Sequence, residues 1–245
     1  VYERALELVD ESTRLRCRRF YHRADAYRCL IGRLLPRVLL ARDGVPPASI
    51  TFSETPARKP FFATPDLVPP IAYNISHDNE GVAMAFVRGA RDGVGVDIMR
   101  LSAPRRGSFA SFVDSVGDTL TPRETATLLA PSLPGPAALR TFYRIWTTKE
   151  AYAKSIGLGL GFDFARIECA FGAGDTMEVR VDGRVPRGWT FRTYRYDVGA
   201  EPYEVVAARF EEGSAAPCVV QRMDEARVRT VEARVFVEEA IRLLG

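Results

Sequence analysis

Two short segments carry the residue types that metal-assisted phosphate chemistry needs. WTTKEAYAK (146–154) contains Glu150 and Lys154, which are four residues apart and so project from one face of a helix. GVGVDIM (93–99) contains Asp97 near the end of an apolar strand, where an unpaired buried charge would be costly. Mg²⁺ favours one or two carboxylates together with water and substrate phosphates. Asp97 and Glu150 together have the chemistry of such a site.

Structural roles for the same residues compete with this hypothesis. A Glu–Lys pair at this spacing is most often a solvent-exposed ion pair of small energetic value, and an aspartate at a strand end can cap a turn. The apolar neighbours Trp146 and Tyr152 weigh against an exposed helix face. Met99 shares a strand face with Asp97, and a thioether is a poor ligand for a hard cation, so water would have to complete the coordination.

A third segment, YNISHD (73–78), adds two polar side chains that suit a phosphate. Ser76 and His77 are expected in a turn before a strand. A lone histidine is more often structural than a ligand, so this segment is weak evidence by itself. The chain has two histidines, and its four cysteines form no CxxC pair, which argues against a zinc site.

The elements that must position these residues alternate between helices and strands in both halves, which indicates an α+β fold. Thr121, Pro122 and Glu124 form a helix start with a capping box. Pro36 is an awkward residue inside a predicted helix. The spacing of apolar residues predicts helices over 25–41, 139–156 and 228–244 and strands over 49–52, 81–87, 93–98, 177–181, 190–196 and 204–210.

Composition narrows the class of protein. There are 34 basic and 31 acidic residues, a net charge of +3, which is far from the charge of a nucleic-acid coat protein. The first forty residues are the basic end. No run reaches the length of a membrane span, and no signal-peptide pattern is present. We therefore expect a cytoplasmic protein with free thiols that binds neither nucleic acid nor membrane.

Taken in order, the segments resemble those of the 4′-phosphopantetheinyl transferases of the single-chain, Sfp-like type. The resemblance covers most of the chain, and the segment around 146–154 is its most specific part. It is carried by RLRCRRFYHRADAYRCLIGRLL (14–35), RKPFF (58–62), NISHD (74–78), GVGVDIM (93–99) and FYRIWTTKEAYAKSIGLGL (142–160).

The resemblance implies a fold of two similar α+β halves, related by a pseudo-twofold axis, with coenzyme A (CoA) in the cleft between them. We expect the halves at residues 1–98 and 99–245. The implied reaction moves 4′-phosphopantetheine from CoA to a serine of an acyl or peptidyl carrier protein and releases 3′,5′-ADP. The carrier could belong to a fatty-acid, polyketide, nonribosomal-peptide or lysine pathway, and the enzyme is expected to be a monomer.

The resemblance also assigns roles to individual residues. Asp97 and Glu150 would hold Mg²⁺ on the CoA pyrophosphate, Lys154 would contact those phosphates, and Glu150 is the candidate base. Many bacterial members carry a carboxylate where this chain has Met99, whereas some eukaryotic members resemble this chain. The adenosine side of CoA would be received by Arg16, Arg28, Cys29, Lys59, Ser76 and His77.

The sequence also indicates a docking surface for the carrier and leaves two rival functions open. Residues 104–136, rich in proline, are the expected surface for an acidic carrier protein. A Mg²⁺-dependent nucleotide hydrolase could use the same carboxylates, although the chain has no GxxxxGK[ST] phosphate loop. A binding module without catalysis is the other rival, but it would have no need of Asp97, Glu150 and Lys154 together.

Overall fold

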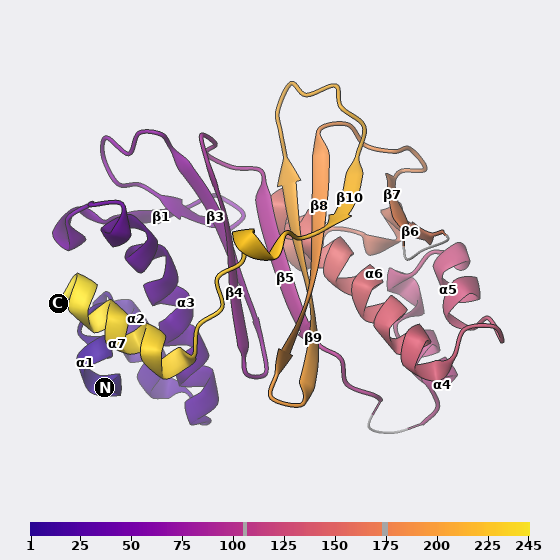
Figure 1. Ribbon diagram of the computed structural model, residues 1–245, viewed down its shortest axis with the longest axis horizontal. Helices are drawn as coiled ribbons and strands as arrows, with labels where there is room; N and C mark the ends of the chain where they lie inside the picture. The colour runs from indigo at the N-terminus through magenta and orange to yellow at the C-terminus, as the bar shows by residue number, and fades with distance from the viewer. Residues whose placement is uncertain (105–106, 173–175) are drawn as a thin grey trace. The chain divides into compact units, whose positions relative to one another are not determined.

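The computed structural model describes residues 1–104, 107–172 and 176–245. These residues form two compact units, Val1–Asp92 with Asp224–Gly245, and Gly93–Met223 (Figure 1). This division differs in two respects from the expected boundary between residues 98 and 99. The strand that begins at Val94 pairs inside the second unit, and the last helix of the chain packs with the first and third helices.

The first unit combines four helices with two antiparallel strand pairs, β1–β2 and β3–β4. Its elements are α1 (Tyr2–Leu6), α2 (Glu11–Arg19), α3 (Arg23–Arg42), the 3₁₀ turn η1 (Pro47–Ser49), β1 (Phe52–Glu54), β2 (Pro60–Phe62), β3 (Ile71–Asp78), β4 (Gly81–Arg88), the 3₁₀ turn η6 (Glu225–Arg227) and α7 (Ala233–Leu244).

Helix α3 organises this unit. Its buried positions Ala26, Leu30, Leu34 and Val38 recur every four residues, as the apolar spacing predicts, and α3 continues through Pro36. In Figure 1 the yellow C-terminal helix α7 lies beside the indigo helices of the N-terminus. The buried face of α7 (Phe236, Val237 and Ala240) joins α1 and α3 in one core.

The second unit consists of a four-stranded sheet, a long helix and a peripheral hairpin with short helices. The sheet order is β10–β8–β9–β5, with β10 parallel to β8 and the other neighbours antiparallel. The elements are β5 (Val94–Arg100), α4 (Phe109–Ser115), η2 (Gly117–Thr119), α5 (Pro122–Leu128), α6 (Gly135–Ser155), η3 (Gly159–Gly161), η4 (Phe164–Arg166), β6 (Ile167–Phe171), β7 (Met177–Val181), β8 (Trp189–Val198), β9 (Glu201–Phe210) and β10 (Val219–Arg222).

Helix α6 lies along β5 and β9, and its apolar residues complete the core of this unit (Figure 1). Tyr152 of α6 packs on Trp189 of β8, with ring centroids 4.3 Å apart, and Ile145 is fully buried. The capping box predicted for Thr121 and Glu124 is present at the start of α5. The α+β class is therefore confirmed.

Two local predictions were wrong. Ser76 and His77 lie in β3 rather than in a turn, because the chain reverses later, at Asn79 and Glu80, where Asn79 adopts a positive φ of 46°. The strand expected over 49–52 begins only at Phe52, because the preceding residues Pro47–Ser49 form a 3₁₀ turn.

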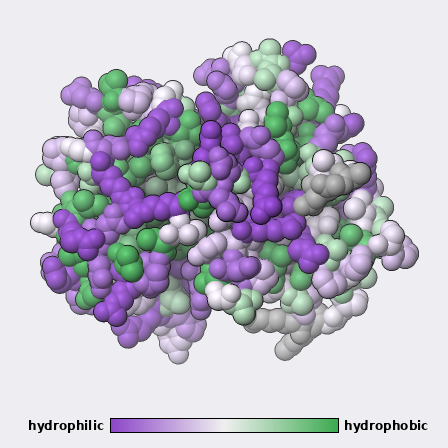
Figure 2. Space-filling model, viewed as in Figure 1, coloured by the Kyte–Doolittle hydropathy of each residue, from purple (hydrophilic) through white to green (hydrophobic). Residues whose placement is uncertain are grey.

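The surface of the molecule is predominantly polar on the face shown in Figure 2, where apolar residues form small separate patches. All four cysteines are free thiols, as expected. No helix in the described part of the chain is both long and apolar enough to cross a bilayer.

Candidate active site

Strand β5 and helix α6 bring Asp97, Glu150 and Lys154 together. The Lys154 Nζ lies 2.6 Å from Asp97 Oδ1 and 3.9 Å from Glu150 Oε2. Asp97 is 3% exposed and Glu150 is 8% exposed, so the pair four residues apart on α6 is not a solvated surface ion pair. The lysine instead bridges two carboxylates that come from different elements of the second unit.

A glycine in the GVGVDIM segment permits this approach of helix and strand. A Cβ atom at Gly95 would lie 2.1 Å from the carbonyl oxygen of Ala151 and 2.5 Å from the amide nitrogen of Ser155. Gly95 and Asp97 are two residues apart on β5 and therefore face α6 together. The absent side chain lets the backbone of α6 pack directly against β5, within reach of Asp97.

The electrostatics of the cluster suit proton transfer. Burial raises the pKa of Glu150 above its ordinary value; Lys154 partly offsets the rise, and the neighbouring Asp97 adds to it. A carboxyl group with a raised pKa is a stronger base than an exposed glutamate when ionised. The site therefore holds a carboxyl group whose pKa is raised above that of an exposed glutamate.

The donor set of this cluster fits a hard cation, although only in part. Asp97 and Glu150 supply two carboxylates, the ligands that Mg²⁺ takes, while Met99 offers a thioether. Within residues 1–104, 107–172 and 176–245, no three or more His, Cys, Asp or Glu side chains group together in a way that could hold a metal ion. Asp97 and Glu150 would thus hold Mg²⁺ with water and substrate phosphate as its other ligands.

A second buried charge cluster, which the sequence did not reveal, lies on the same face of the sheet. Glu204 of β9 pairs in register with Met99 and is fully buried. The Arg144 Nε of α6 lies 3.1 Å from Glu204 Oε1, and the Arg195 Nε of β8 lies 3.5 Å from Glu204 Oε2. Burial raises the pKa of Glu204, and the two arginines oppose that rise. The only local signal was a glutamate in an apolar strand.

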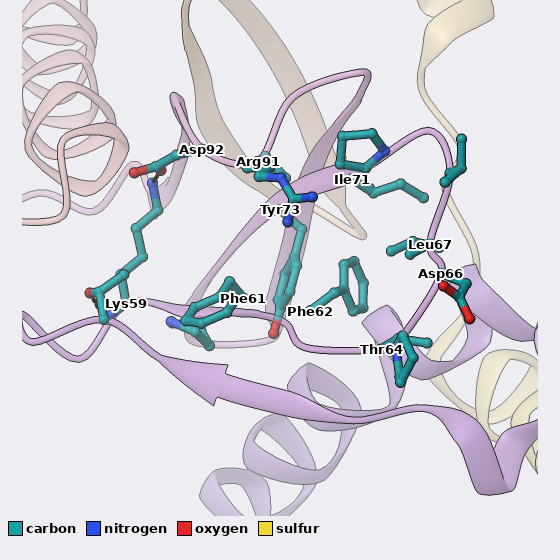
Figure 3. A pocket seen from close by; sticks show the side chains of 16 residues that line it. Lys59, Phe61, Phe62, Thr64, Asp66, Leu67, Ile71, Tyr73, Arg91 and Asp92 are labelled. Atoms are coloured by element: carbon teal, nitrogen blue, oxygen red, sulfur yellow. Dashed lines mark hydrogen bonds and ion pairs between the residues drawn. The ribbon is translucent and has the colours of Figure 1, made fainter.

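In the first unit, Lys59 borders a pocket of about 600 Å³ (Figure 3). Lys59 is 8% exposed and forms an ion pair with Asp92 at one end of the pocket. Phe62 and Tyr73 lie side by side in its wall, with ring centroids 4.5 Å apart. Burial raises the pKa of the Tyr73 hydroxyl, with Arg33 and Arg37 opposing the rise, so the phenol stays protonated.

Arg28 and His77 occupy the same side of β3, whereas Ser76 does not. A Cβ atom built at Gly32 of α3 would lie 3.6 Å from Ile75, so Ile75 faces α3. His77 is two residues further along β3 and therefore shares that face. Arg28, one turn before Gly32, donates to the carbonyl oxygen of Asn79 in the β3–β4 turn. Ser76 is buried on the opposite strand face, while His77 is exposed.

The remaining two predicted residues lie on the packed helices α2 and α3. Arg16 is exposed on α2. Cys29 of α3 is half-buried and forms a side-chain hydrogen bond with Cys17 of α2, which adds to the effect of burial in raising the pKa of Cys17 to about 12. The structure thus brings together Asp97, Glu150 and Lys154 as expected, and it gathers the first-unit residues less closely.

Comparison with known families matches both parts of the chain. A family model described as the 4′-phosphopantetheinyl transferase superfamily matches residues 93–208. A second, described as the N-terminal part of 4′-phosphopantetheinyl transferase, matches residues 1–88. The two matches meet close to the boundary between the compact units.

Individual relatives extend this match over nearly the whole chain. The chain is 43% identical to the 4′-phosphopantetheinyl transferase pptA of Paxillus involutus, over 98% of this chain and 92% of the relative. It is 30% identical to the L-aminoadipate-semialdehyde dehydrogenase-phosphopantetheinyl transferase of Mus musculus, over 86% of this chain and 70% of the relative. A solved holo-(acyl-carrier-protein) synthase from Bacillus anthracis, in complex with CoA (3′,5′-ADP), is 18% identical to this chain with a TM-score of 0.35. The match covers 49% of this chain and 96% of the synthase.

Proposed function

The chain belongs to the 4′-phosphopantetheinyl transferase family, and we propose that it transfers 4′-phosphopantetheine from CoA to a carrier-protein serine, releasing 3′,5′-ADP with Mg²⁺ required. The observation that carries the proposal is the cluster of Asp97, Lys154 and Glu150, in which a lysine lies between two buried carboxylates. Enclosing two carboxylates away from water is costly, so their burial supports a role for these charges in the reaction.

In the proposed reaction the serine oxygen attacks the phosphorus that carries pantetheine. A new P–O bond forms to serine, and the bond to the bridging oxygen of the pyrophosphate breaks, so that 3′,5′-ADP leaves. Glu150 accepts the serine proton directly or through a water, for which its raised pKa suits it. Mg²⁺ held by Asp97 and Glu150 would neutralise charge on the pyrophosphate.

Lys154 is proposed to serve two partners at once. An ammonium group carries three hydrogen-bond donors, so Lys154 can keep its contact with Asp97 and still donate to a phosphate oxygen. Its side chain is 25% exposed, against 5% for that of Asp97, so a ligand can reach part of it from solvent. The positive charge then stabilises the negative charge that builds up on the leaving phosphate.

The adenosine side of CoA is assigned to the first unit, from the sequence resemblance. Arg28 and His77, on one side of β3, support this assignment most directly. Lys59 borders a pocket, but it is engaged with Asp92, so CoA phosphate would have to share or displace that partner. The least supported assignments are those of Ser76, which is buried, and of Arg16 and Cys29 on the helices.

The carrier protein is proposed to dock on residues 104–136, of which 105–106 lie outside the described residues. A pocket of about 410 Å³ opens beside this segment, between Ser102 and Pro104 on one side and α4 on the other. Phe112 of α4 and Tyr143 of α6 line it. The name of the mouse relative suggests an L-aminoadipate-semialdehyde dehydrogenase as one carrier to test. Action as a monomer in the cytoplasm stays a prediction.

A single substitution tests the catalytic assignment. Glu150→Gln keeps the size and an amide oxygen but cannot accept a proton at neutral pH. We expect it to bind CoA and Mg²⁺, measured by calorimetry, while its single-turnover rate falls about 100-fold or more. A Glu150→Gln enzyme with the turnover of the wild type would refute Glu150 as the base. Consumption of CoA without any carrier protein would favour the hydrolase instead.

A further inference from the structure

The residue that precedes the proposed base has a fully buried charge of its own. Lys149 is 1% exposed, and its Nζ donates to Glu124 Oε2 at 2.6 Å and to the carbonyl oxygen of Thr119 at 2.8 Å. Lys149 and Lys154 are five residues apart, or about 140° around the helix, so they leave α6 toward different neighbours. Lys154 reaches β5, whereas Lys149 reaches α5 and η2.

Glu124 connects Lys149 to two further elements. Its Oε2 also accepts from the amide of Thr121 at 2.8 Å, and its Oε1 accepts from the amide of Cys169 in β6 at 2.8 Å. One carboxylate, with no exposed surface, therefore joins α5, β6 and α6. A group with this many charge-assisted bonds fixes its neighbours in one geometry.

Stability alone is a poor reason for such a pair. Two apolar residues of similar volume would stabilise a buried site at least as well, because removing both charges from water is costly. The pair instead fixes the relative placement of α5, β6 and α6, because its hydrogen bonds form together in one arrangement of these elements only. That arrangement also sets the rotation of α6, and hence where Glu150 points.

We propose that Glu124 and Lys149 are positioning residues, which hold α6 so that Glu150 and Lys154 stay beside Asp97 during transfer. The two anchors act from different sides of the helix: Lys154 with β5, and Lys149 with Glu124. Neither Glu124 nor Lys149 contacts the reacting atoms in this account. The inference rests on the proposed function, because it acts through the base assigned there.

The test compares four variants in the full chain, at a temperature where each is folded. Lys149→Met removes the charge and keeps the length, Lys149→Arg keeps the charge, and Glu124→Gln keeps the shape. Met177→Ala, which shortens a buried side chain of the same core outside the pair, is the control for lost stability. The readouts are kcat, the KM for CoA, the thermal midpoint, and hydrogen exchange of the α6 amides at residues 147–153.

For Lys149→Met and Glu124→Gln we expect kcat to fall tenfold to 100-fold, with the KM for CoA within threefold of the wild type and with faster exchange over 147–153. Met177→Ala should lose thermal stability but keep kcat and α6 protection, and Lys149→Arg should recover part of the lost kcat. The proposal is overturned if Lys149→Met keeps the kcat of the control, or if its α6 exchange is unchanged.

A reference variant separates this inference from the function on which it rests. Glu150→Gln, measured in the same assay, must lose turnover if Glu150 is the base. Should Glu150→Gln stay active, the proposed function has failed at that residue, whatever Lys149→Met does. Should Glu150→Gln be inactive while Lys149→Met matches the control, the positioning role alone is refuted.

Discussion

Replacing Gly95 by alanine perturbs the site without removing any functional group. A Cβ atom there would lie 2.1 Å from the carbonyl oxygen of Ala151, and ordinary contacts begin at 3.4 Å. The obstructing atoms are backbone atoms of α6, so no side chain can rotate away. Strand β5 and helix α6 must therefore separate by about 1.3 Å.

That separation acts directly on the catalytic cluster, because Asp97 moves with β5 while Glu150 and Lys154 move with α6. Overpacking of this kind costs about 1–3 kcal/mol in the free energy of unfolding. A misplacement of about 1 Å can cost 100-fold in rate. We expect Gly95→Ala to fold with reduced stability and to lose roughly 100-fold in turnover.

The assay is transfer to an apo carrier protein, with stability measured in parallel by urea unfolding. Gly135→Ala is the control on the same helix, since a Cβ at Gly135 meets nothing within 4 Å and alanine favours a helix by up to about 1 kcal/mol. It should keep full turnover. A Gly95→Ala enzyme with the stability and turnover of the wild type would contradict the close approach of α6 to β5.

Three further variants test the charges of the site. Burial raises the pKa of Glu150, so as the pH rises above 4.5 the carboxyl group ionises more readily in the unfolded chain, and the folded wild type loses stability. Glu150→Gln has no such charge and should be more stable than the wild type at pH 7. Urea titrations should show no difference between the two below about pH 4. Equal stability at pH 7 would count against the raised pKa. Lys154→Met leaves Asp97 buried beside Glu150 without its cation and should lower the free energy of unfolding by roughly 3 kcal/mol. An unchanged urea midpoint would show that the ion pair of Lys154 with Asp97 contributes nothing to stability. Met99→Glu should stay active with an altered metal preference, measured with Mg²⁺ against Mn²⁺; a folded but inactive protein would oppose this.

Local patterns predicted the elements well where the chemistry was local. The apolar spacing of α3 and α6 and the capping box of α5 are present as expected. The turn before β4 was placed too early, because Ser76 is also a residue type that favours turns, while the positive φ that sets the reversal belongs to Asn79.

Long-range pairs were beyond the reach of the sequence. Glu124 could be recognised as a capping residue, but its bond to Lys149 joins positions 25 apart, and that between Arg144 and Glu204 joins positions 60 apart. Gly95 illustrates the same limit, because only its distance from α6 shows why a side chain is excluded there. Asp97 and Glu150 were paired by the chemistry of their carboxylates and by the resemblance of whole segments, not by their spacing.

The central claim is that this chain moves phosphopantetheine from CoA to a carrier serine at the cluster of Asp97, Glu150 and Lys154. Mass spectrometry of an apo carrier protein after incubation with the enzyme, CoA and Mg²⁺ tests it most directly. We expect one added phosphopantetheine on the carrier serine and one equivalent of 3′,5′-ADP, both lost on chelation of Mg²⁺ and both formed about 100-fold more slowly by Glu150→Gln. An unmodified carrier across a panel of apo carriers, or modification by Glu150→Gln at the rate of the wild type, would contradict the account.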